Sequence, residues 1–507
     1  MSQEGTVLDV AAFGEPLGYV VDGATPRSLR FVSPRPPAIG DYVLVEAEPR
    51  PLIGLVRAVG TRSVTLSSLP GVYDPVVVER LRAEASRDDV FFECSVSIVG
   101  DAESLEMPRM PPLPGSRVYR APPELLARLF GGEPPRRVRI GTLLARPDVA
   151  VYVDVNRMVT RHTAILAVTG AGKSNTVAVI ADRLASIGGT LLVFDFHGEY
   201  VGTAIGGGVN TIPAKINPRL LSIGELMVLL GIEHRFYNQE RVLRKALEIV
   251  RAKQVQRGFL EELADAVEKI RSLERRREES TAAVAVLNKI EALAERYGDV
   301  IDDAAPDPLT RLQPGRVNVV DLSRVDEDAA DVVVSHVLRK LLVERKRHKH
   351  GEKSMVPYPV LVVLEEAHIL APRDEDTLSK YWLARVAREG RKFGIGLMLV
   401  SQRPKGLDPD ILSQMNNLVV LRIVEPSDQR YIQEASESLS SDLVEQLPSL
   451  NTGEAILVGP FVPAPALVKI DRYGGRLGGG DPDVVSEWAR LREKAEVPPE
   501  DVYSDLL

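Results

Sequence analysis

Apolar residues along this chain follow two different periods, which divide it into a β-rich first part and a longer α/β part. Within residues 1–106, short β-rich segments recur at a spacing of about 10–12 residues, with Gly, Pro and Asp between them. These segments are residues 18–22, 28–32, 40–45 and 52–58, and residues 90–98 add another alternating strand. Such spacing is typical of a small β-barrel.

From residue 138 onward, continuous apolar runs alternate with helical patterns, which favours a parallel sheet covered by helices. The runs occupy residues 163–168, 190–196, 317–322, 360–365, 395–401 and 418–423. Between the second and third runs, residues 218–308 show almost no strand pattern and repeat with helical spacing. We therefore predict an α/β core, residues 138–217 and 309–473, interrupted by a helical insertion at 218–308.

The connections at the two ends of this core differ in composition. Residues 107–137 form a predicted linker, Pro-rich at first and containing a short helix at 124–130. The core ends with two segments, 454–458 and 466–471, that predict antiparallel strands. Glycine-rich residues 474–480 then lead to a helical pattern at 484–495, so residues 474–507 form a predicted C-terminal extension.

The most specific chemical signal follows the first apolar run of the core. A glycine-rich turn there leads into a helical pattern, which lets backbone N–H groups and a helix N-terminus surround phosphate oxygens. Lys173 would neutralise the β- and γ-phosphates, and the Ser174 hydroxyl would ligate Mg²⁺. Ala167 replaces the first glycine of the P-loop pattern, and we expect it to be tolerated because that position needs no positive φ. The predicted ATP contacts from this loop are Thr169, Gly170, Ala171, Gly172, Lys173, Ser174, Asn175 and Thr176.

A second apolar run ends in paired carboxylates, Glu365 and Glu366. In a P-loop fold this strand lies beside the phosphate loop, so its end reaches the Mg²⁺ and the γ-phosphate. Glu365 would face the Mg²⁺ and Glu366 would orient and deprotonate the attacking water. An acidic start to a helix is the alternative interpretation. With the P-loop, this pair predicts a RecA-like ATPase core.

Basic and polar residues downstream add candidates for completing the site. Arg385, Arg388 and Arg391 are three residues apart on a predicted helix, and Gln402 follows the next strand, where it can sense the γ-phosphate. Arg391 can reach a triphosphate bound by a neighbouring subunit, and Arg161 is a second candidate for such a contact. A solvated basic stripe is the alternative for this helix.

Composition narrows the classes of protein that fit. The chain has 507 residues, with 26% charged residues and a formal net charge of −8. A single cysteine, Cys94, excludes a disulfide framework and is typical of a cytoplasmic protein. No apolar run approaches the ~20 residues of a membrane span, so no membrane partner is expected. The negative net charge does not exclude nucleic acid as a partner, since basic groups can be confined to an inner surface.

Taken together, these motifs resemble the HerA ATPases of archaea, within the FtsK–HerA translocase superfamily. The matching segments are Arg161-His162, Thr169-Gly-Ala-Gly-Lys-Ser-Asn-Thr176, Asp195-Phe-His-Gly-Glu-Tyr200, Glu365-Glu-Ala-His368, Gly390-Arg-Lys-Phe-Gly394 and Ser401-Gln-Arg-Pro404. Phe196 stands where the family usually has proline. The resemblance covers most of the chain, because the N-terminal β region is similar to the HAS barrel of rotary ATP synthase subunits.

This resemblance implies a homohexameric, ATP-driven translocase or helicase on double-stranded DNA. It implies a role in end resection and double-strand break repair with a NurA-type nuclease, which docks on the barrel face of the ring. It also implies that the C-terminal extension braces a neighbouring subunit. Arg403 and Lys405 are the favoured DNA contacts. Further basic candidates are Arg235, Arg241, Arg244, Lys245 and the run 345–349.

Two other functions remain open from the sequence. A conjugation-type or protein-pumping ATPase shares the superfamily, although such proteins usually carry membrane-docking segments. A nucleotide-gated scaffold would bind ATP without turnover, but it would not need Lys173, Glu366 and Arg391 together. ATPase assays with and without linear duplex DNA separate the three.

Overall fold

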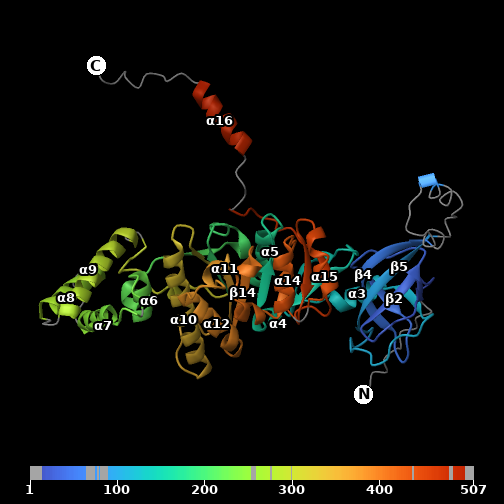
Figure 1. Cartoon of the computed structure of the whole chain (residues 1–507), viewed down its shortest axis with the longest axis horizontal. Helices are drawn as coiled ribbons and strands as arrows, with labels where there is room; N and C mark the ends of the chain where they lie inside the picture. Colours follow the sequence, from blue (N-terminus) through green and yellow to red (C-terminus); the bar gives the residue numbers. More distant parts are fainter. Residues whose placement is uncertain are drawn as a thin grey trace.

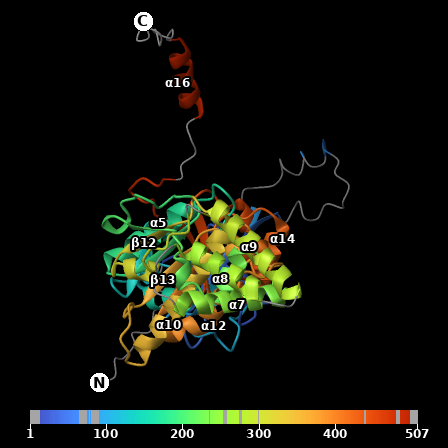
Figure 2. The same cartoon turned by 90° about the vertical axis from the view of Figure 1, so that its left-hand side faces the viewer.

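Three structural parts follow one another along the longest axis of the molecule. The computed structural model describes residues 14–63, 75–76, 79, 90–233, 235–252, 258–273, 277–297, 300–436, 439–478 and 484–496. A β-barrel (blue in Figure 1) lies at one end, the α/β core lies in the centre, and helices of the insertion lie at the other end. The last helix, α16 (Val484–Glu496), lies away from the body in Figures 1 and 2. The remaining residues of the predicted barrel region and C-terminal extension are outside the described ranges.

The described N-terminal residues form a closed barrel with strand order β1-β2-β5-β4-β3-β6. Its strands are β1 (Gly18–Val20), β2 (Ser28–Ser33), β3 (Tyr42–Val45), β4 (Leu52–Ser63), β5 (Val90–Asp101) and β6 (Arg117–Arg120). β6 pairs with both β1 and β3 and so closes the barrel. The barrel therefore extends to Arg120, beyond the boundary predicted at residue 106. Four residues behind a Pro-rich stretch are too few to show an alternating pattern.

The core is built on a sheet of eleven strands within the described residues, in the order β11-β12-β10-β13-β14-β9-β15-β16-β17-β7-β8. Neighbouring strands from β11 across to β15 in this list are parallel, and neighbouring strands from β15 across to β8 are antiparallel. The parallel strands β10, β13 and β14 are buried throughout, which explains their continuous apolar runs. The predicted α/β class is confirmed. The strands are β7 (Arg137–Leu143), β8 (Ala150–Asp154), β9 (Thr163–Leu166), β10 (Leu191–Asp195), β11 (Asn210–Pro213), β12 (Val317–Asp321), β13 (Val360–Leu364), β14 (Ile395–Ser401), β15 (Asn417–Val420), β16 (Glu454–Val458) and β17 (Ala466–Ile470).

Helices cover this sheet and connect its parallel strands. They are α3 (Pro123–Phe130), α4 (Val155–Thr160), α5 (Lys173–Ser186), α10 (Glu327–Lys349), α11 (Ala367–Leu370), α12 (Leu378–Glu389), α13 (Pro409–Ser413), α14 (Pro426–Ala435) and α15 (Ser441–Val444). On α5 the apolar stripe Val177, Ile180 and Leu184 faces the core and is buried. No helix among the described residues has both the length and the apolar character that crossing a bilayer demands.

The described residues of the insertion include the α-helices α6 (Ile223–Leu229), α7 (Tyr237–Ala252), α8 (Phe259–Leu273) and α9 (Arg277–Tyr297). The last three pack against one another, and Figure 2 shows them in front of the core when the molecule is viewed along its length. These helices occupy the segments in which the sequence repeats with helical spacing. The spacing is visible because each helix buries an apolar stripe and exposes a charged face.

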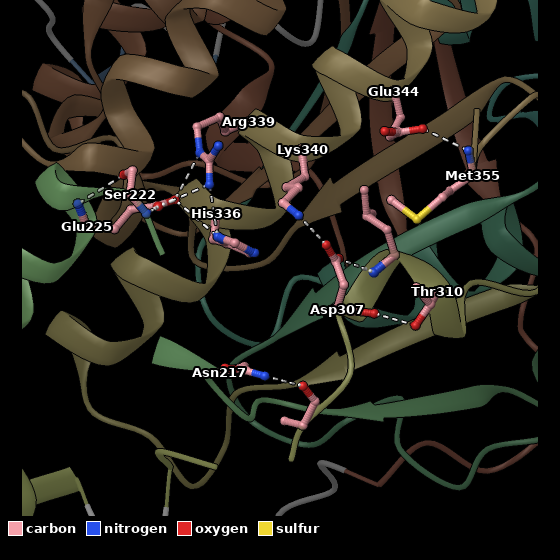
Figure 3. A network of polar contacts seen from close by, with 12 residues as sticks. Asn217, Ser222, Glu225, Asp307, Thr310, His336, Arg339, Lys340, Glu344 and Met355 are labelled. Atoms are coloured by element: carbon pink, nitrogen blue, oxygen red, sulfur yellow. Dashed lines mark hydrogen bonds and ion pairs between the residues drawn. The ribbon is translucent and has the colours of Figure 1, made fainter. Parts of the chain in front are cut away.

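Ion pairs attach both ends of the insertion to α10 (Figure 3). At the entry, buried Glu225 lies 3.3 Å from His336 and 3.2 Å from Arg339. At the exit, Lys340 donates to Asp307 at 2.6 Å. Burial alone would raise the pKa of Glu225, but hydrogen bonding to His336 and Ser222 lowers it to about 2. The insertion is thus fixed on α10 rather than attached only by its chain ends.

Candidate active site

The phosphate loop connects the end of β9 to the start of α5. Gly170 and Gly172 have φ of 75° and 104°, a region that favours glycine. A Cβ on Gly172 would also lie 3.2 Å from the backbone nitrogen of Gly453. Ala167 is fully buried and is not among the residues with positive φ. Glycine is therefore present where the backbone requires it, and alanine fits at the first position of the motif.

Lys173 lies between the two carboxylates that follow β13. Its Nζ is 2.5 Å from Glu366 Oε1 and 3.5 Å from Glu365 Oε2. Burial opposes the charge of Lys173, but the attraction of Glu365 and Glu366 outweighs it and raises the pKa of the lysine. The ammonium group is therefore charged, and an incoming phosphate competes with Glu366 for it.

Glu365 is almost fully buried and accepts a hydrogen bond from the Tyr200 hydroxyl at 2.5 Å. Burial raises the pKa of Glu365 to about 7, although Lys173 and Tyr200 both oppose this shift. The negative charge of this carboxylate is therefore only partly compensated by the protein. A cation beside Glu365 would stabilise its ionised form.

Glu366 combines burial with a strained backbone. Its φ and ψ are 42° and 45°, in the left-handed region, which costs about 1–3 kcal/mol for a residue other than glycine. Within the described residues, its Oε2 is buried without a hydrogen-bond partner, and His368 Nδ1 lies 3.4 Å from it. His368 also contacts Ser401 Oγ at 3.2 Å. Strain of this kind is typical of active sites.

Gln402 lies at the carboxyl end of β14, next to the phosphate loop. Its Oε1 accepts a hydrogen bond from Thr169 Oγ1 at 2.7 Å. The structure therefore brings the predicted sensor into contact with the first polar residue of the loop. A ligand bound in the loop would perturb this contact directly.

The last residues of the motif have different surroundings. Ser174 is partly exposed in the first turn of α5. The Asn175 amide donates to the carbonyl of Asp471 at 2.9 Å and accepts from the backbone nitrogen of Tyr473 at 2.8 Å. Thr176 is buried, and its hydroxyl donates to the carbonyl of Gly172 at 2.9 Å. In this structure the side chains of Asn175 and Thr176 support the loop instead of lining it.

The donor set suits a magnesium ion that arrives with a nucleotide. No group of three His, Cys, Asp or Glu residues in the described part of the chain is arranged as a metal cage. Mg²⁺ usually takes one or two protein oxygens, several waters and substrate phosphates. Ser174 and Glu365 would supply such a set. One oxygen each of Glu199 and Glu366 is buried and has no hydrogen-bond partner among the described residues, which adds acceptors to the same region.

The predicted arginines lie at the opposite edge of the sheet. Arg391 precedes β14 in a 3₁₀ turn, Gly390–Phe393, and Arg161 caps the end of α4, two residues before β9 begins. β9 and β14 pair in parallel, so both arginines are at the amino edge, about 20 Å along β14 from the phosphate loop. Between them, His162 is held by the backbone of Ala387 and Leu397, each at 3.0 Å. An arginine side chain is too short to span this distance to the phosphate loop of the same chain.

Basic residues divide into exposed and paired groups. Arg403 and Lys405 are exposed just after Gln402, on the same edge as the phosphate loop. Arg345, in contrast, is buried and donates to the carbonyls of Phe393 and Val356. The four basic candidates of the insertion form ion pairs within it: Arg235–Glu233, Arg241–Glu279, Arg244–Glu240 and Lys245–Glu279.

Comparison with known proteins identifies the family. The model of the family described as "Helicase HerA, central domain" matches residues 138–341. The chain is 40% identical over 494 residues to the DNA double-strand break repair helicase HerA of Sulfurisphaera tokodaii, covering 95% of this chain and 98% of that protein. The HerA of Saccharolobus solfataricus is also 40% identical, with 95% and 97% covered. The chain belongs to the HerA helicase family.

A solved structure extends the likeness of this HerA-family chain at the level of the fold. VirB4 of Thermoanaerobacter pseudethanolicus matches with a TM-score of 0.50 and 18% identity, over 68% of this chain and 98% of that protein. The 40% identity to HerA proteins confirms the resemblance, and the likeness to VirB4 supports the α/β fold of the core.

One functional element of this HerA-family chain had no role assigned from the sequence. The segment 195–200 served only as a family signature, but it contacts the site. The Asp195 carboxylate accepts backbone N–H groups of His197 at 3.3 Å, Glu199 at 3.1 Å and Tyr200 at 2.9 Å. β10 pairs in parallel with β13, so this loop lies beside Glu365. A carboxylate at a strand end followed by glycine was the signal that could have indicated a structured loop.

Proposed function

We propose that this chain is the motor subunit of a homohexameric ring that uses ATP to translocate along or unwind double-stranded DNA during end resection and double-strand break repair. The observation that carries this proposal is the 40% identity over 95% of the chain to proteins named as DNA double-strand break repair helicases. Coverage of this extent includes the barrel, the core and the insertion, so more than an ATPase fold is shared.

The site residues predicted from the two motifs have separate tasks in ATP hydrolysis. Lys173 binds the β- and γ-phosphates once they displace Glu366. Ser174 and Glu365 would hold Mg²⁺, which would supply positive charge beside the phosphates. Glu366 orients the attacking water and takes its proton. Gln402 senses the γ-phosphate through its contact with Thr169.

The position of the arginines supports a ring. Arg391 and Arg161 share the edge of the sheet opposite the phosphate loop. In a ring of identical subunits, that edge faces the phosphate loop of the next subunit. Arg391, with Arg161 beside it, then adds positive charge to the neighbour's phosphates as negative charge develops on them. The C-terminal extension, which includes α16, braces the adjacent subunit.

DNA contact is assigned to Arg403 and Lys405. Both are exposed and follow Gln402 directly, so a change in nucleotide state can reach them through one short segment. Phosphate contacts of this type carry no sequence information, which suits a motor that moves along any duplex. A cytoplasmic location belongs to the same proposal and is supported by the single cysteine, Cys94, which is free and buried.

Linear duplex DNA should increase ATP hydrolysis by the purified full-length protein several-fold, and the increase should fall as salt rises because phosphate contacts are screened. Phosphate release measured with and without duplex tests this. Lys173→Ala is the control and should be inactive under both conditions. Hydrolysis that duplex leaves unchanged favours a protein-pumping ATPase, and nucleotide binding without hydrolysis favours a scaffold.

Deleting residues 1–120 should abolish binding of a NurA-type nuclease while ATP hydrolysis largely persists. We assign nuclease docking to the barrel because repeated barrel surfaces around a ring add weak contacts by avidity. Binding measured by co-sedimentation, beside ATPase rates, tests this assignment. Full-length Lys173→Ala should still bind the nuclease. Light scattering of the truncated protein checks assembly, since Tyr42 of the barrel donates to the core carbonyl of Pro465. Unchanged nuclease affinity after deletion would place docking elsewhere.

A further inference from the structure

Tyr200 places a buried hydroxyl in the active site, and the hydrolysis scheme above gives it no task. The residue is 1% exposed, and its hydroxyl lies 2.5 Å from Glu365 Oε1. The phenol O–H donates this hydrogen bond, and the Glu365 carboxylate accepts it.

The loop that carries Tyr200 is built to hold this hydroxyl in place. Three backbone N–H groups of the loop, including that of Tyr200, donate to Asp195 at the end of β10. Gly198 has a φ of 70°, which completes the tight turn. The backbone nitrogen of Gly478 donates to the carbonyl of Glu199 at 2.8 Å and supports the loop from the other side. The hydroxyl position is thus determined by backbone contacts rather than by a freely rotating side chain.

This contact makes the two oxygens of Glu365 unequal. Oε1 is taken by Tyr200, whereas Oε2 lies 3.5 Å from Lys173 Nζ, on the side of the phosphate loop. A carboxylate held at one oxygen cannot rotate freely about its last bond. Only one oxygen is then presented toward the nucleotide.

We propose that Tyr200 is a positioning residue for Glu365: its hydroxyl holds Oε1 so that Oε2 faces the Mg²⁺ that accompanies ATP. This inference rests on the ATPase function proposed above. Residues that orient metal ligands in this way typically change metal affinity 10–100-fold when they are removed. Phenylalanine keeps the ring and its packing in the core, so Tyr200→Phe removes the hydroxyl alone.

The test is a Mg²⁺ titration of fluorescent ATP-analogue binding to the full-length Tyr200→Phe protein. Affinity for the analogue without Mg²⁺ should stay close to that of the unmodified protein. The Mg²⁺ concentration that gives half of the Mg²⁺-dependent tightening should rise about 10-fold or more. Hydrolysis should require correspondingly more Mg²⁺ and recover at saturation. Tyr431→Phe is the matched control, since that hydroxyl donates to the carbonyl of Leu407 at 2.6 Å, outside the site.

A second background separates positioning from a general structural effect. In a Glu365→Gln protein, adding Tyr200→Phe should cause no further shift of the Mg²⁺ titration, because the residue acts through the Glu365 carboxylate. An equal shift in both backgrounds, or a Tyr200→Phe curve that matches Tyr431→Phe, would overturn the proposal. Lys173→Ala tests the underlying function separately: if it binds the analogue normally, the ATPase assignment fails, whatever the Tyr200 result.

Discussion

Replacing Glu366 with glutamine should lower the rate of ATP hydrolysis about 100-fold or more while ATP still binds. Glutamine keeps the size of the side chain but cannot take a proton from water. It also loses the ion pair with Lys173, now 2.5 Å long, so the lysine becomes freer to contact phosphate. The affinity for ATP should therefore be equal or tighter. Steady-state kcat and equilibrium nucleotide binding of the purified variant measure the two effects.

Glu389→Gln is a suitable control for this variant. Glu389 pairs with Lys346 at 2.5 Å on the surface, and surface pairs of this kind contribute about 0–1 kcal/mol to stability. Its kcat should match that of the unmodified protein. Near-normal turnover in Glu366→Gln would remove Glu366 from the role of general base. Glu199, whose buried Oε2 has no hydrogen-bond partner in the described part of the chain, would become the next candidate.

Elements with a strong local pattern were predictable from the sequence. The strands β9, β10, β12, β13, β14 and β15 are buried on both faces, so each appears as a continuous apolar run. β6 and β11 were not predicted, because each has only four residues and is positioned by pairing with a strand that is distant in the sequence. A short segment carries too little pattern to reveal a partner far away in the chain.

Site residues could be predicted from the sequence where the residue type alone indicates the chemical task. Lys173, Glu365 and Glu366 meet in the structure because β9 and β13, with β14 between them, end at the same edge of the parallel sheet. Residues whose role depends on a distant partner could not be derived in this way. Asn175 faces the backbone after β17, nearly 300 positions away, and Tyr200 contacts Glu365 only through the register of β10 and β13.

Alanine at Arg391 should reduce ATP hydrolysis about 10³-fold or more in a uniform ring, as arginines that reach a neighbour's phosphates typically do. Uniform Lys173→Ala rings should be equally inactive. Mixed in equal amounts, the two variants should regain activity. A site is complete when its phosphate loop comes from an Arg391→Ala subunit and its arginine comes from a Lys173→Ala neighbour. Random mixing gives about a quarter of such interfaces in a closed ring.

Recovery of this kind depends on the arginine acting between subunits. If Arg391 served the site of its own chain, neither variant would contain a complete site, and mixing would restore nothing. The 20 Å that separate the two edges of β14 favour the first outcome. Mixed rings must be demonstrated with differently tagged subunits before rates are compared. Lys392→Ala, an exposed neighbour of Arg391, is the matched control and should hydrolyse ATP normally. Mixed rings that remain inactive would mean that Arg391 does not complete the neighbouring site, and the same experiment with Arg161→Ala would then test the second arginine on that edge.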